Sequence, residues 1–195
     1  MSAMVQLLGL KDSSHVLDVG GTIDLWHLAP VTPALVLLNE SRAAADIGSG
    51  APVVFGDGLA LPFADRSFDL VFSNSVIEHV GNHHDQEVFA REIARVGRSY
   101  WVQTPNRRFP VEQHLWTPGL HWLPRKAQRG LLTYPITPWE WLTKPGIDER
   151  KYYVSHYCES VHLLDAKQLS DLFPEASIVV ERIFGWPKSL IAYRR

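Results

Sequence analysis

The stretch HVLDVGGT, residues 15–22, decides the fold class of this 195-residue chain. An apolar run that ends at an acidic residue and is followed at once by two glycines is typical of a buried strand entering a tight turn. Glycine carries no Cβ, so the backbone of such a turn can approach a ligand closely. Ligands of open parallel sheets bind at the carboxyl edge, so the stretch predicts a nucleotide-type site, although such turns also occur for structural reasons alone.

Further apolar runs predict four more strands, at 34–39, 52–55, 68–73 and 99–104. Their apolar residues are nearly continuous rather than alternating, which is typical of strands buried on both faces of a parallel sheet. Apolar residues at helical spacing predict a helix over 84–96.

The carboxyl-terminal part predicts a helix and two more strands. Asp165 can cap the helix, with Gln168 at the capping-box position, and strands at 176–184 and 189–194 follow with a short connection. That connection makes them an antiparallel pair. The expected fold is therefore a doubly wound, Rossmann-like α/β domain over 1–195, with a mostly parallel seven-stranded sheet.

The segment 105–164 fits none of these elements. It is too long for a plain loop and too aromatic for a disordered segment. We expect an aromatic-rich cap insertion, folded over the carboxyl edge of the sheet. Its tryptophans either form the core of a small subdomain or line a pocket for a planar, sugar-like or lipidic acceptor; they are Trp116, Trp122, Trp139 and Trp141.

The composition is that of an ordinary globular protein, with 46% hydrophobic and 21% charged residues and a formal net charge of −2. This charge argues against a general nucleic-acid or membrane-surface binder. No run approaches the ~20 apolar residues of a membrane span, and no basic-then-apolar signal peptide opens the chain. Cys158 is the single cysteine, so a reducing cytoplasm is the expected compartment.

Three motifs resemble those of the class I S-adenosylmethionine-dependent methyltransferases, in their type-11 branch. The run DGLALPFADRSFDLV, residues 57–71, resembles the block that surrounds the fourth strand of that family. VIEHV at 76–80 continues the pattern, and TPN at 104–106 resembles the triplet after the fifth strand. The likeness covers about 15–110 and resumes over 164–195, and it leaves the motifs of 111–163 unassigned.

The resemblance implies a cofactor site for S-adenosylmethionine along the sheet edge. The implied residues, in chain order, are Asp18, Gly20, Gly21 and Thr22 for the methionine part, Asn39 and Glu40 for the ribose, Asp57, Gly58 and Leu59 for the adenine, and Ser73 and Asn74 near the methyl group. Two departures stand out. Thr22 and Asp24 occupy positions where the family commonly has glycine, and Asn39 accepts a hydrogen bond more weakly than the usual carboxylate.

Methyl transfer from a sulfonium needs alignment of donor and acceptor more than it needs a metal or a covalent intermediate. If the acceptor is a hydroxyl, a base must take its proton. We expect Glu112 and His114, just past the TPN triplet, to be base and orienter. A metal reading of these two residues with His121 matches no known ligand spacing, so no metal is expected. The other histidines considered are His83, His84 and His156, while His79 is expected only to pack at the start of a helix.

Three functions remain open at this stage. The first is a methyltransferase that acts on the oxygen or carbon of a small-molecule acceptor, with the 105–164 segment as acceptor pocket. The second is an NAD-dependent oxidoreductase, but the Gly-x-Gly-x-x-Gly turn is missing and the 57–71 block is then unexplained. The third is a catalytically inert binding protein, suggested by the altered glycine motif. No basic groove or peptide channel indicates a nucleic-acid or protein acceptor.

Overall fold

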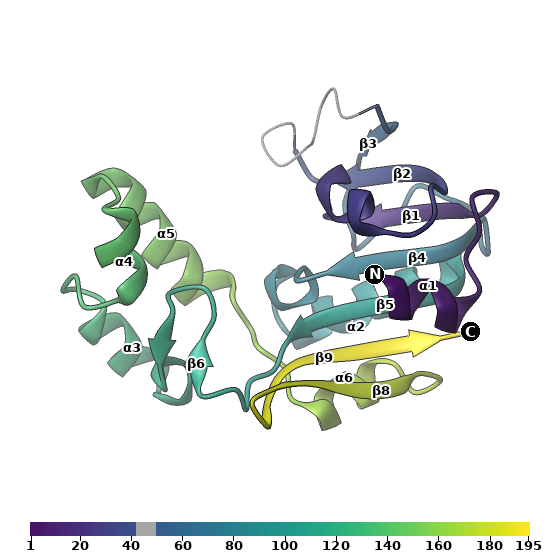
Figure 1. Ribbon diagram of the computed structural model, residues 1–195. Helices are drawn as coiled ribbons and strands as arrows, with labels where there is room; N and C mark the ends of the chain where they lie inside the picture. The colour runs from purple at the N-terminus through teal and green to yellow at the C-terminus, as the bar shows by residue number, and fades with distance from the viewer. Residues whose placement is uncertain (42–49) are drawn as a thin grey trace.

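The computed structural model describes residues 1–41 and 50–195, which form a seven-stranded sheet flanked by helices, with a separate helical lobe (Figure 1). The strand order is β3-β2-β1-β4-β5-β9-β8. Neighbouring strands among β1–β5 pair in parallel, whereas β9 pairs antiparallel with both β5 and β8. The strands are β1 (His15–Val19), β2 (Ala34–Asn39), β3 (Val53–Phe55), β4 (Phe68–Asn74), β5 (Gly97–Pro105), β8 (Ser177–Ile183) and β9 (Trp186–Arg194).

Helices cover both faces of the sheet. One face is packed by α2 (His83–Val96) and α6 (Ala166–Leu172), whose Phe89, Ile93 and Leu169 are fully buried in the larger core. The other face is covered by α1 (Ser2–Leu8) and the short 3₁₀ helix η1 (Ile23–Leu28), which contribute to a second core with β1, β2 and β4. Because helices bury both faces of the sheet, the strands are nearly continuous apolar runs.

Local sequence signals set the helix ends. Asn82 caps α2 through its side chain and forms a capping box with Asp85. Asp165 caps α6 in the same way with Gln168, as the sequence predicts. Each box satisfies backbone N–H groups that a helix start would otherwise leave unpaired. Another short 3₁₀ helix, η2 (Ile77–His79), follows β4 and carries the Glu-His pair of the VIEHV motif.

The segment between β5 and α6 folds as a lobe with its own small core. It comprises β6 (Val111–Glu112), β7 (Thr117–Pro118), η3 (Leu120–Trp122), α3 (Arg125–Leu131), α4 (Pro138–Thr143) and α5 (Ile147–Ser160). Its core contains Leu115, Tyr157 and Val161. In Figure 1 the lobe lies to the left of the sheet, beyond the carboxyl ends of β4 and β5.

The expectation that the four lobe tryptophans form the core of a small subdomain is wrong for three of them. Trp139 is buried and stacks on Tyr153, but Trp116, Trp122 and Trp141 are 44%, 54% and 64% exposed. The rest of the lobe core, besides Trp139, consists of leucine, valine, tyrosine and the single cysteine. Among the described residues, no helix combines the length and the apolar character that a membrane crossing requires.

Candidate active site

Two cavities meet at Gly20, where β1 ends at the carboxyl edge of the sheet. One, of about 380 Å³, is lined by residues of the first turn and by Asn74; the other, of about 370 Å³, lies toward β2 and β3. Gly20 lines both cavities. The edge between β1 and its two neighbours, β2 and β4, is where open α/β sheets bind ligands, because the strand order reverses there.

The two glycines of this turn leave no room for a side chain. Gly20 has φ +78°, and a Cβ on it would lie 2.6 Å from Cγ2 of Val76. A Cβ on Gly21 would lie 2.2 Å from the Oδ2 atom of Asp18. The double glycine therefore follows from the tight approach of Val76 on one side and the Asp18 carboxyl group on the other.

Asp18 is 1% exposed, and it also lines the first cavity. The indole Nε1 of Trp26 donates to its Oδ2 at 2.7 Å, while its Oδ1 has no hydrogen-bond partner among the described residues. Burial raises the pKa of Asp18 to about 7, and the Trp26 hydrogen bond only partly opposes this. A buried carboxyl with a free oxygen suits a positively charged ligand group.

The second cavity collects the residues expected at the ribose and the adenine. Its lining includes Asn39, Glu40, Asp57, Gly58 and Leu59. The amide of Asn39 is buried and donates to the carbonyl oxygen of Gly21 at 3.3 Å, so it braces the glycine turn. The Asp57 Oδ1 accepts from the backbone N–H of Leu59 at 2.8 Å, and the exposed side chain of Glu40 stands next to the buried Asn39.

Ser73 is a correction to the predicted site. Ser73 ends the predicted strand 68–73, and the structure pairs it with Val102 inside the sheet, while β4 continues one residue further, to Asn74. It is fully buried, its Oγ donates to the carbonyl oxygen of Val19 at 3.2 Å, and it lines neither cavity. Asn74, the last residue of β4, lines the first cavity, and Ser75, which follows it at φ 57°, lines the second.

The predicted pairing of Glu112 and His114 is present as a contact. Glu112 is fully buried, and its Oε1 lies 2.6 Å from Nδ1 of His114. The same carboxylate accepts from the backbone N–H groups of His114 and Leu115. Burial lowers the pKa of His114, but the hydrogen bond and the charge of Glu112 outweigh this and raise it overall.

His79 is the residue that sequence reasoning missed. It lines the second cavity, and its Nε2 lies 3.2 Å from Nε2 of His114. Burial, followed by the nearby His114 and His156, lowers the pKa of His79 to about 4. The VIEHV motif already drew attention to His79. However, His79 lies 35 positions from His114, and nothing in the sequence predicts that the two side chains are in contact.

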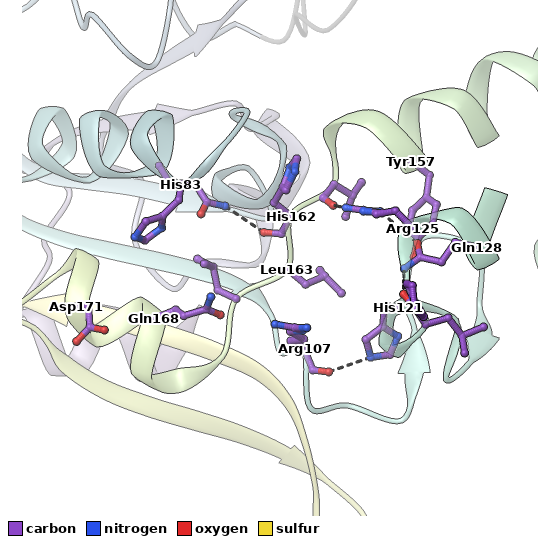
Figure 2. Close-up of a pocket in the computed structure, with 15 residues that line it drawn as sticks. His83, Arg107, His121, Arg125, Gln128, Tyr157, His162, Leu163, Gln168 and Asp171 are labelled. Carbon is purple, nitrogen blue, oxygen red and sulfur yellow. Dashed lines mark hydrogen bonds between the residues drawn. The ribbon is translucent and has the colours of Figure 1, made fainter.

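A third cavity, of about 470 Å³, lies between the lobe and the start of α2 and α6 (Figure 2). Arg107, His121 and Arg125 line it from the chain that enters the lobe, and His83 and Gln168 line it from the sheet side. It shares no lining residue with the two cavities at Gly20. His121 contacts the carbonyl oxygen of Arg107 through its Nε2 atom, at 2.9 Å.

Comparison with known proteins points to one family. A family described as a methyltransferase domain matches residues 28–99. The chain is 36% identical over 110 residues to a ubiquinone/menaquinone biosynthesis C-methyltransferase of Paracoccus denitrificans, covering 49% of this chain and 44% of that protein. It is 41% identical over 103 residues to an ajmaline N-methyltransferase of Rauvolfia serpentina, covering 46% and 34%. The chain thus spans less than half the length of these curated relatives.

Solved structures agree on the fold. A SAM-dependent methyltransferase of Methanosarcina mazei superposes with a TM-score of 0.57 at 15% identity, covering 100% of this chain and 98% of that one. S-adenosylmethionine is therefore the expected cofactor. The residues at the sheet edge fit it, because Asp18 offers a buried, unpartnered oxygen to the first cavity, and Gly20, which has no side chain to obstruct either space, lines both cavities.

Proposed function

We propose that this chain, which its matches assign to the class I S-adenosylmethionine-dependent methyltransferases, transfers a methyl group to an oxygen or carbon of a small-molecule acceptor. The observation that carries the proposal is the pair of cavities that meet at Gly20. One contains the Asp18 carboxyl and the other contains Asp57, so a ligand with a cationic end and a nucleoside end has a partner for each.

The cofactor would lie across the shared Gly20. Its amino-acid end belongs beside Asp18, Gly21 and Thr22, its ribose beside Asn39 and Glu40, and its adenine beside Asp57–Leu59. When bound, it supplies a methyl group that is already activated by the positive charge on sulfur. The protein's contribution is then to hold donor and acceptor in line, which supplies about 7–11 kcal/mol in well-oriented systems.

His79, which lines the second cavity, and His114, which contacts His79, supply the base. Glu112 accepts from Nδ1–H of His114, which leaves the His114 Nε2 lone pair to accept from Nε2–H of His79. This assignment leaves Nδ1 of His79 unprotonated and without a partner among the described residues. We assign the uptake of the acceptor's proton to this chain of His79, His114 and Glu112, in which His79 is the member that lines the cofactor cavity.

Calorimetric titration tests the proposal. The protein should bind S-adenosylmethionine and S-adenosylhomocysteine, and it should not bind NAD. Asp57→Asn keeps the oxygen that holds Leu59 but places a donor where the adenine amino group needs an acceptor, so the affinity should fall by about 1–3 kcal/mol. Asp148→Asn, in the first turn of α5 on the lobe, is the matched control. Binding of NAD alone would favour an oxidoreductase, and binding of neither ligand would favour a different or inert binding protein.

A further inference from the structure

Three side chains from two distant parts of the sequence bring metal-ligand atoms together beside the second cavity. Glu78 and His79 come from η2, and His114 comes from the lobe. One carboxylate oxygen and one ring nitrogen from each histidine lie within 4.8 Å of one another. Two histidines and one carboxylate are a common ligand set for divalent transition metals in proteins.

Two polar atoms of this group are buried without a hydrogen-bond partner among the described residues: Oε1 of Glu78 and Nδ1 of His79. Glu78 is 0% exposed, and in the described part of the chain no lysine or arginine forms an ion pair with its carboxyl group. Buried carboxylates are normally paired or coordinate a metal, because an isolated charge is costly to remove from water. The hydrogen-bonding within the protein thus leaves this carboxylate incompletely satisfied.

The spacing of the two imidazoles suits a shared cation. Their Nε2 atoms are 3.2 Å apart and their rings are nearly perpendicular, at 83°. Two nitrogens that each lie about 2.0–2.1 Å from a tetrahedral zinc ion are roughly 3.3 Å apart. A proton shared between the rings also accounts for the distance, so a direct binding measurement must separate the two.

The groups behind the ligands are those that metal sites use for orientation. The fully buried Glu112 holds Nδ1 of His114 at 2.6 Å, which directs the Nε2 lone pair of that ring toward His79. Oγ1 of Thr104 donates to Oε2 of Glu78 at 2.9 Å, which leaves Oε1 free. A carboxylate behind a ligating histidine, and a hydrogen bond to a ligating carboxylate, fix the ligands and tune their basicity.

We propose that Glu78, His79 and His114 bind one divalent cation of the zinc class, with at least one coordination position left open. The cation takes the place of the proton between the two imidazoles. Because His79 lines the cofactor cavity, the open position is adjacent to the place where the acceptor must bind. An acceptor hydroxyl bound there would ionise more readily and lose its proton to solvent, so the cation would take over the role of the histidine base in the proposed function. Only this last consequence rests on methyl transfer; the site itself does not.

The test is a titration of chelator-treated protein with Co²⁺, followed by visible absorption, and then displacement by Zn²⁺. One equivalent should bind with the intense bands of a four- or five-coordinate site. Glu78→Gln and His114→Gln should each weaken binding at least tenfold, and Glu112→Gln, which only removes the positioning carboxylate, should weaken it by about 10–100-fold. Circular dichroism shows whether each variant is folded.

The control is the exposed group His83, His84 and Glu87 on α2, which is the obvious surface site for stray cations. His84→Gln should leave the one-equivalent titration unchanged. The proposal is overturned if the wild-type protein takes up no Co²⁺, which would mean a shared proton only, or if folded Glu78→Gln binds as tightly as the wild type. Because cation uptake is read without turnover, a failure here is distinct from a failure of the cofactor titrations.

Discussion

Binding of S-adenosylmethionine at pH 6 should release a proton from Asp18. In the free protein the buried carboxyl has a pKa of about 7, so it is about nine-tenths protonated at pH 6. The amino-acid end of the cofactor carries an ammonium group, which favours the ionised carboxylate. Linkage then requires release of roughly 0.9 proton at pH 6 and roughly 0.1 at pH 8, with affinity falling toward about tenfold per unit below pH 7.

Calorimetry in two buffers of different ionisation enthalpy measures the number of protons released. Asp18→Asn should abolish the release at pH 6, because the amide has no proton to lose in this range. Asp24→Asn is the matched control, since Asp24 is an exposed carboxylate that lines the same cavity. The reasoning is refuted if the wild-type protein releases no proton at pH 6, or if Asp18→Asn releases as many protons as the wild type does.

Three further outcomes are expected. In the cofactor-free protein the pKa of Asp18 is raised, so the folded state keeps a proton that the unfolded chain loses near pH 4. The free energy of unfolding should therefore fall as the pH rises from about 4 to 7, and thermal melts of Asp18→Asn should show a weaker decline. Asp165→Ala removes the cap of α6 and should lower the free energy of unfolding by about 1 kcal/mol in urea titrations, whereas the exposed Asp148→Ala serves as comparison. Gly20→Ala should weaken cofactor binding, because a φ of +78° is strained for alanine and the added Cβ would meet Val76. A double variant with Val76→Ala should recover part of the affinity. A Gly20→Ala protein that binds the cofactor normally would contradict the close approach of Val76 to the turn.

The sheet was predictable because its signals are local. Near-continuous apolar runs gave five parallel strands close to their observed bounds, and the Asp165–Gln168 box placed the start of α6 at the right residue. The short connection between the last two strands correctly indicated an antiparallel pair. Each of these features depends on a few consecutive residues, so one sequence is enough to recognise it.

The contents of the site depended on tertiary contacts and were predicted less fully. His79 and His114 meet only because the lobe returns to η2, where the N–H of His162 donates to the carbonyl oxygen of Glu78. Ser73 was expected near the methyl group, but its hydroxyl is buried within the sheet and donates to the carbonyl oxygen of Val19, a contact between strands that one sequence does not reveal. The lobe tryptophans were misread because tryptophan content does not tell a small core from an exposed aromatic surface.

A structure of the protein with S-adenosylhomocysteine tests the central claim most directly. The account predicts the ligand across the carboxyl edge at Gly20, with its amino-acid end against Asp18 and Gly21 and its adenine against Asp57–Leu59. It also predicts the sulfur on the side of the cavity where His79 lies. A ligand found instead in the cavity of Figure 2, between Arg107 and Arg125, or one bound with its adenine against Asp18, would contradict it.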